Sequence, residues 1–190
     1  MKFTPLHIAA LIELGLCWIA WWLAFLKPLK QAAGKQKTDR ARSSWIGVIF
    51  EAAGFFCVWF VLRPADFSKS TPALVASMLL GPPAVALAWF ATHHLAQQWR
   101  FEAALSDDHT LVNTGPYHYI RHPIYLSMLG MMLATAFAWT WWPMTLAGLV
   151  LFLIGTEIRV HAEEKLLMLR FGEAFWEYQA NTRAYLPFIR

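Results

Sequence analysis

The residues best suited to chemistry lie in one short segment, Leu111 to Tyr125, which reads LVNTGPYHYIRHPIY. Thr-Gly-Pro is typical of a turn. Pro123 suits the first position of a helix, because its fixed φ fits there and its missing N–H needs no partner. A helix N-terminus attracts anions, so Arg121 beside it predicts a site for a carboxylate or a phosphate. The alternative is that Arg121 and His122 extend to lipid headgroups.

A second polar motif, Glu157 to Glu164, reads EIRVHAEE. On a continuous helix, Glu157, His161 and Glu164 share one face, whereas Arg159 and Glu163 stand four residues apart and can pair. A solvated end of an amphipathic helix has the same pattern. The segment therefore indicates a site only if another motif faces it.

The rest of the chain is mostly apolar and must position these motifs. Of 190 residues, 58% are hydrophobic and 15% are charged, whereas a soluble domain has roughly 25% charged residues. A membrane span needs about 20 apolar residues. The sequence predicts an all-α, polytopic transmembrane bundle in a single membrane domain, 1–190, with five spans at 5–26, 45–62, 72–91, 124–142 and 143–160.

Basic residues gather between the first two predicted spans and orient the bundle. The segment from Lys27 to Arg42 carries six Lys or Arg residues and one acid, Asp39. The positive-inside rule places it in the cytoplasm. Alternation then puts the N-terminus outside and the catalytic segments, 93–123 and 157–190, in the cytoplasm. The chain has a net charge of +4, but its basic residues are not spread along a groove with interleaved aromatic residues. No nucleic acid is therefore expected as a partner.

The last two predicted spans form a hairpin through Trp142-Pro143, which brings the two motifs to the same depth. The Arg121–His122–Pro123 corner then meets the Glu163–Glu164 pair, and their opposite charges suit a zwitterion. S-adenosylmethionine is such a ligand, with a carboxylate, an ammonium and a sulfonium. Rings that could attract the sulfonium are those of Tyr117, Tyr119, Tyr125 and Phe171.

The second half of the chain, about Leu95 to Pro187, resembles the isoprenylcysteine carboxyl methyltransferase and phospholipid methyltransferase families. The resemblance is carried by Gly115-Pro116-Tyr117, Arg121-His122-Pro123 with Tyr125, Glu163-Glu164, Phe171-Gly172, Tyr178 and the stretch from Arg183 to Pro187. It implies a membrane methyltransferase that uses S-adenosylmethionine. It also implies cofactor contacts for Tyr117, Arg121, His122, Pro123, Tyr125, Glu163 and Glu164.

The acceptor is expected to be lipophilic, because a soluble acceptor needs no active site at a bilayer. An isoprenylcysteine-like carboxylate is favoured by the resemblance, with a phospholipid amine or a small thiol as alternatives. A carboxylate could be held by Arg183 or Arg100, whereas an amine or a thiol needs a base. The candidate bases are His122, His161 and Glu157, and the candidate catalytic residues are Arg121, His122, Glu164 and Arg183.

Two charged residues, Glu13 and Glu51, fall within predicted spans, where ionisable groups are costly. They either line an acceptor tunnel or form hydrogen bonds between helices. The methionines near the last hairpin either line a lipid channel or pack in the core, and core packing is favoured.

Competing functions are a His-ligated membrane metalloprotein, an NADPH-dependent membrane reductase and a non-catalytic membrane subunit. Six histidines lie near the predicted cytoplasmic face: His93, His94, His109, His118, His122 and His161. However, the prolines around His118 and His122 argue against one regular helix, so no metal is assigned. The short loops favour the cytoplasmic (inner) membrane of a prokaryote.

Overall fold

A computed structural model describes residues 4–32, 39–40, 44–59, 69–95, 104–105 and 110–185. The helices are α1 (Pro5–Ala32), α2 (Ser44–Trp59), α3 (Thr71–Leu95), α4 (Pro116–Tyr119), α5 (Pro123–Trp139), α6 (Trp142–Phe171) and α7 (Glu173–Asn181). Two short strands, β1 (Asp39–Arg40) and β2 (Ala104–Leu105), pair antiparallel. Within the described residues, the regular elements are therefore helices apart from one two-residue ladder.

Three described helices are long and apolar enough to cross a membrane: Pro5–Leu26 within α1, and the whole of α3 and of α6. The first of these ranges has the bounds predicted from the sequence. Helices α2 and α5 are apolar but shorter. Helix α6 has 30 residues, about 45 Å at 1.5 Å per residue, which exceeds a hydrocarbon core of about 30 Å.

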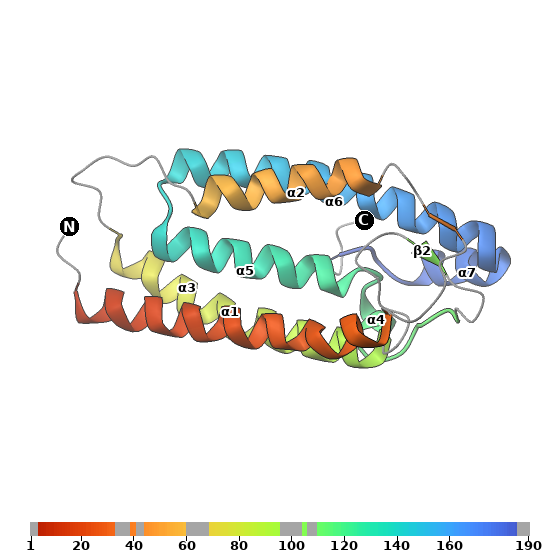
Figure 1. Ribbon diagram of the computed structural model, residues 1–190, viewed down its shortest axis with the longest axis horizontal. Helices are drawn as coiled ribbons and strands as arrows, with labels where there is room; N and C mark the ends of the chain where they lie inside the picture. Colours follow the sequence, from red (N-terminus) through yellow and green to blue (C-terminus); the bar gives the residue numbers. More distant parts are fainter. Residues whose placement is uncertain are drawn as a thin grey trace.

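Helix α5 runs through the middle of the bundle (Figure 1), with α2 and α6 on one side and α1 and α3 on the other. It begins at Pro123, as predicted. The last two long helices do form a hairpin, but α6 packs mainly against α2 and α5 mainly against α3. Helices α4 and α7 lie at the same end of the bundle as the C-terminal part of α6.

The α2–α6 contact is a close antiparallel approach of two backbones. A Cβ atom on Gly47 would lie 2.6 Å from the carbonyl oxygen of Gly155, and one on Gly54 would lie 2.7 Å from that of Gly148. Both pairs repeat at a spacing of seven residues, which keeps them on the contacting faces. Small residues of this kind let membrane helices pack without a hydrophobic driving force.

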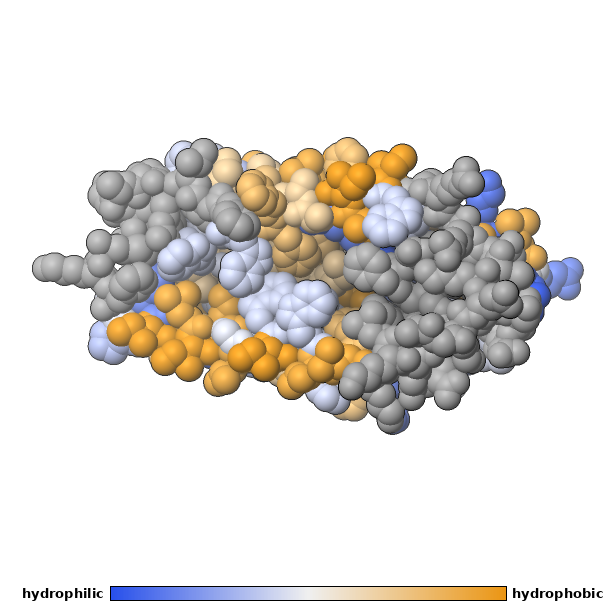
Figure 2. Space-filling model, in the orientation of Figure 1, coloured by the Kyte–Doolittle hydropathy of each residue, from blue (hydrophilic) through white to orange (hydrophobic). Residues whose placement is uncertain are grey.

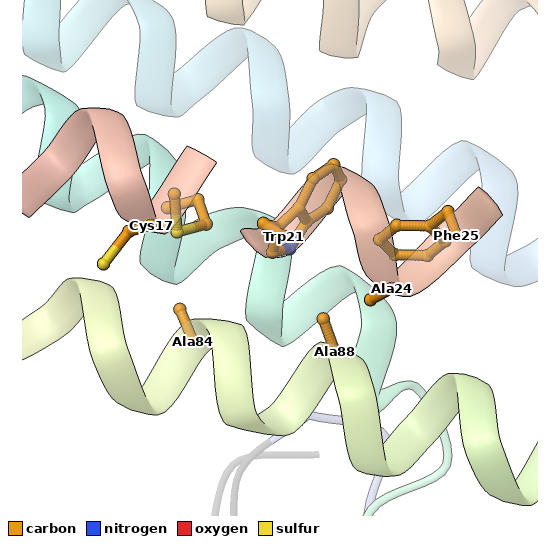
Figure 3. Packing of buried hydrophobic residues seen from close by; sticks show 7 residues of the cluster. Cys17, Trp21, Ala24, Phe25, Ala84 and Ala88 are labelled. Carbon is orange, nitrogen blue, oxygen red and sulfur yellow. The ribbon is translucent and has the colours of Figure 1, made fainter. Parts of the chain in front are cut away.

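The core near the site end is built from α1, α3 and α5. Cys17, Trp21, Ala24 and Phe25 of α1 face Ala84 and Ala88 of α3, and Figure 3 shows the α1 rings above these small side chains. The indole of Trp21 also donates a hydrogen bond to Ser127 of α5. Large rings therefore fill the space that small residues leave on the neighbouring helices.

Two methionines of α5 belong to the packed interior. Met131 and Met132 are fully buried in two hydrophobic clusters. By contrast, many Leu, Ile and Trp side chains are exposed on the outer faces of the long helices. Figure 2 shows apolar side chains over the middle and the left part of the visible face. Such a surface suits lipid as solvent, and the protein is an integral membrane protein.

Candidate functional site

The turn before α5 depends on a glycine. Gly115 has a φ of 60°, and a Cβ atom there would lie 2.4 Å from the ring of His94 on α3. Pro116 opens the single turn of α4, and the chain is then extended at Ile120. Because Pro123 starts α5, Arg121 and His122 occupy a corner between two helices. The predicted corner is present.

Residues 182–185 close over this corner by backbone pairing. The amide of Arg121 donates to the carbonyl oxygen of Arg183 at 2.7 Å, and that of His122 donates to Ala184 at 2.9 Å. Ile120 and Arg183 form a parallel bridge. These hydrogen bonds give the corner amides partners within the protein, so the anion site expected at this helix start is partly occupied by the chain itself.

The Arg121 guanidinium forms a salt bridge with Glu164. Its Nε and Nη2 atoms lie 2.9 Å and 2.8 Å from Oε1 of that carboxylate. Its Nη1 donates to the carbonyl oxygens of Thr182 and Gln179. Both charged side chains are buried. The predicted meeting of the Arg corner and the Glu pair therefore occurs: two guanidinium nitrogens contact one oxygen of Glu164, and the third binds the C-terminal segment.

His122 lies between the two carboxylates. Its Nε2 is 3.1 Å from Oε1 of Glu164, and its Nδ1 is 3.7 Å from Oε2 of Glu163. The Tyr125 hydroxyl donates to Oε1 of Glu163. Glu163 keeps 25% of its side-chain surface exposed, against 9% for Glu164. Glu163 is therefore the more accessible carboxylate of the pair.

Besides the bond from Arg121 to the Gln179 carbonyl oxygen, two side chains of helix α7 form hydrogen bonds with this arrangement. The Tyr178 hydroxyl donates to the carbonyl oxygen of Tyr117 at 2.5 Å, and the Gln179 amide donates to Oε2 of Glu164 at 3.0 Å. Burial raises the pKa of Tyr178 and, together with the charge of Glu163, that of Tyr117. Both phenols therefore stay neutral over the physiological range.

A second buried ion pair lies deeper along α6. Nη1 of Arg159 is 2.8 Å from Oε2 of Glu51 on α2, and the guanidinium stands over the Tyr125 ring, 5.1 Å from its centroid. The sequence suggested Glu163 as the partner of Arg159, but the structure pairs Arg159 with Glu51. Of the two roles considered for Glu51, bonding between helices is the one observed.

Other predicted residues lie at the edge of the site. The side chain of Arg183 is exposed, and only its carbonyl oxygen contacts the corner. His161 is exposed and contacts Glu157 on the outer face of α6. Tyr119 is 72% exposed, whereas the rings of Tyr117 and Tyr125 are buried. Phe171 is half-buried at the end of α6.

Some predictions fall outside the described residues. These are Arg100, His109 and the side chains of the cationic segment 27–42. Among the residues that the structure describes, no group of three or more His, Cys, Asp or Glu side chains could hold a metal ion. Nothing in this part of the chain therefore favours the metalloprotein alternative.

Sequence reasoning missed Gln179 and Thr182 as parts of the site. Gln179 contributes its side-chain amide and its carbonyl oxygen, whereas Thr182 contributes only its carbonyl oxygen. Backbone acceptors leave no signature in side-chain type. The position of Gln179, one residue after Tyr178 of the quoted pattern, was the only available signal.

Comparison with known proteins gives two findings. A model of the isoprenylcysteine carboxyl methyltransferase (ICMT) family matches residues 75–169, half of the chain. The chain is also 33% identical over 96 residues to Protein-S-isoprenylcysteine O-methyltransferase of Xenopus laevis, covering 45% of this chain and 30% of that protein. The chain thus matches less than a third of the relative's length. The family match includes the Arg121 corner and Glu163–Glu164, but not α7.

Proposed function

The chain belongs to the isoprenylcysteine carboxyl methyltransferase family, and from this membership we propose that it transfers a methyl group from S-adenosylmethionine to a lipophilic acceptor. The observation that carries the proposal is the convergence of the Arg121–His122 corner on Glu163 and Glu164. These residues lie within the matched range and form a charged cluster, buried except for the partly exposed Glu163, at one end of an apolar bundle.

The side chains at this site fit the proposed cofactor. Carboxylates accept hydrogen bonds from an ammonium or from ribose hydroxyls, an imidazole can contact a carboxylate, and tyrosine rings attract a sulfonium. The proposed contacts are Tyr117, Arg121, His122, Pro123, Tyr125, Glu163 and Glu164. When bound, the sulfonium supplies an activated methyl group for an in-line displacement.

The protein's own contribution is mainly positioning. Arg121 holds Glu164 and the 182–185 segment together, so it organises the cluster as well as lining it. Glu163, held by Tyr125 and less buried than Glu164, is the carboxylate best placed to receive a cationic group. The cover formed by residues 182–185 and α7 would keep water from this end of the site.

The proposed acceptor is an isoprenylcysteine-like carboxylate, with a phospholipid amine or a small thiol as alternatives. The name of the Xenopus laevis relative, Protein-S-isoprenylcysteine O-methyltransferase, supports the first of these. A carboxylate is already nucleophilic at neutral pH and needs no base. Arg183 is exposed beside the corner, and we propose that its side chain assists acceptor binding.

We further propose that α2 and α5 also cross the bilayer, which gives five spans. They have 16 and 17 described residues, about 24–26 Å of helix, slightly less than the hydrocarbon thickness of about 30 Å. With five spans, the N-terminus is outside and the site faces the cytoplasm, as the basic segment 27–42 predicts. The proposed compartment is a prokaryotic cytoplasmic membrane.

The test is calorimetric binding of S-adenosylhomocysteine, the demethylated product, to protein purified in detergent. Wild type is compared with Arg121→Ala and Glu164→Ala, and with Lys165→Ala, whose side chain is exposed one position beyond Glu164. Saturable binding in wild type and Lys165→Ala, lost in the other two variants, would support the donor site. Absence of binding in the wild type would refute it.

The acceptor needs a separate assay. Transfer of a labelled methyl group is measured with an S-farnesylated cysteine derivative, a phosphatidylethanolamine and a small thiol in parallel. Transfer to the first alone supports the carboxylate acceptor, whereas transfer only to a water-soluble thiol contradicts a lipophilic one.

A further inference from the structure

Glu51 is a buried carboxylate that the proposed donor contacts do not include. It lies on α2 with 3% of its surface exposed. Its Oε2 is 2.8 Å from Nη1 of Arg159, and its Oε1 accepts a hydrogen bond from Thr156 at 3.2 Å. Both oxygens are therefore held by α6. An ionisable group inside an apolar helix is costly and is usually retained for a function.

The contacts of Arg159 extend from Glu51 to the proposed donor site. Its guanidinium stands over the Tyr125 ring at 5.1 Å, and the Tyr125 hydroxyl donates to Glu163. A continuous set of contacts thus leads from Glu51 on α2, through α6 and α5, to the more accessible carboxylate of the Glu163–Glu164 pair. Each step is a direct contact between side chains.

The surface of α2 is also shaped around Arg159. A Cβ atom on Gly47 would lie 2.4 Å from Cγ of Arg159 and 3.3 Å from its Cδ. Glycine at this position therefore leaves room for the aliphatic part of the arginine. This is independent of the ion pair, and it indicates that α2 is adapted to one particular placement of the Arg159 side chain.

A purely structural role is the alternative, in which the ion pair only fastens α2 to α6. The two helices already contact at Gly47–Gly155 and Gly54–Gly148, and a buried ion pair commonly adds little net stability over apolar packing. What the pair does provide is a defined position for the guanidinium against Tyr125.

We propose that Glu51 is a positioning residue for methyl transfer. It holds Arg159 against the Tyr125 ring, which fixes the Tyr125 hydroxyl and, through it, the Glu163 carboxylate. This inference rests on the proposed function, because Glu163 matters only if it receives the methyl donor. Helix α2 lies outside the family-matched residues 75–169. The proposed positioning residue, Glu51, is therefore in a part of the chain that the family match does not cover.

The experiment is a double-mutant cycle on binding of S-adenosylhomocysteine, measured by calorimetry in detergent. The variants are Glu51→Gln, Tyr125→Phe and the combination of the two. Glu51→Gln is expected to weaken binding roughly fivefold to tenfold, the size of coupling between contacting residues. In the Tyr125→Phe background the same change is expected to weaken binding less than about twofold, because the hydroxyl that contacts Glu163 is already absent.

Two controls separate positioning from stability. Glu51→Asp, which keeps the charge, should retain more binding than Glu51→Gln. Glu177→Gln, which changes an exposed side chain of α7, should bind as wild type does. If Glu51→Gln does not fold, Thr156→Val takes its place, since it removes one hydrogen bond to Glu51. It should weaken binding in the same direction, again only when Tyr125 is present.

The outcomes distinguish the two proposals. Wild-type binding that is unchanged by Glu51→Gln, or reduced by the same factor in both backgrounds, overturns the positioning role and leaves the donor site standing. No binding by wild type overturns the proposed function, and the positioning role with it.

Discussion

Replacement of Gly155 by alanine tests the close α2–α6 contact directly. A Cβ atom at Gly155 would lie 2.6 Å from the carbonyl oxygen of Gly47 and 2.8 Å from the backbone nitrogen of Glu51. Ordinary contact begins at 3.4 Å, so the helices must separate by about 0.8 Å, because backbone atoms cannot rotate aside. The contacts along the remaining interface weaken with that displacement.

The expected cost follows from two opposed effects. Overpacking costs roughly 1–3 kcal/mol, and alanine recovers up to about 1 kcal/mol through its better helix propensity. From the middle of the overpacking range, about 2 kcal/mol, the net loss is about 1–2 kcal/mol, which for a chain of 190 residues lowers Tm by about 2–8 °C. The displacement also stretches the 2.8 Å Glu51–Arg159 contact, so binding of S-adenosylhomocysteine should weaken as well.

The measurement is thermal unfolding in detergent, followed by circular dichroism. Gly15→Ala in α1 is the matched control, because nothing lies within 4 Å of a Cβ atom built there. That variant gains helix propensity without a clash, and its Tm should equal or exceed that of wild type. If Gly155→Ala melts at or above the temperature of Gly15→Ala, the interpretation of the α2–α6 contact is wrong.

Three further predictions concern the site end of the bundle. Gly115→Ala and Gly172→Ala both place alanine at positive φ, 60° and 52°, with ψ of −132° and −122°, a region that side chains rarely adopt, at roughly 1–3 kcal/mol each. Only the first would also strike the His94 ring, so it should lower Tm further, and equal losses would argue against that clash. Arg121→Lys keeps the charge but loses the planar fork; it should lower Tm and weaken S-adenosylhomocysteine binding, and a wild-type-like result in both assays would contradict the organising role. Because burial raises the pKa of Tyr178 above its ordinary 10.0, the unfolded chain releases this proton first as pH rises. Stability should therefore fall above about pH 10, and less steeply in Tyr178→Phe; parallel losses in the two proteins would exclude Tyr178 as the cause.

The meeting of the two polar motifs could be predicted because it depends on helix geometry. Pro123 indicates where α5 begins, and the short connection at Trp142 makes the next helix return alongside it. Helix α5 and the part of α6 that precedes Glu164 are similar in length, so Arg121 and Glu164 lie at the same end of the bundle. Local rules were sufficient for this part of the site.

The choice of partners could not be predicted in the same way. Arg159 had a correctly spaced partner in Glu163, but it pairs with Glu51, which lies 108 positions away on α2. That choice depends on the approach of α2 at Gly47 and Gly155, which is a tertiary contact. The pairing of Arg121 and His122 with Arg183 and Ala184 uses only backbone atoms, and most residue types could provide it.

The backbone bonds from Arg183 and Ala184 also affect when the site is made. These residues follow every described helix in the chain, so they leave the ribosome after all the apolar segments. Helix insertion can proceed while the Arg121 corner still lacks its cover. The helical bundle can therefore form before the Arg121 corner is covered, and the contacts of Arg121 and His122 with residues 182–184 can be made only after those residues have been synthesised.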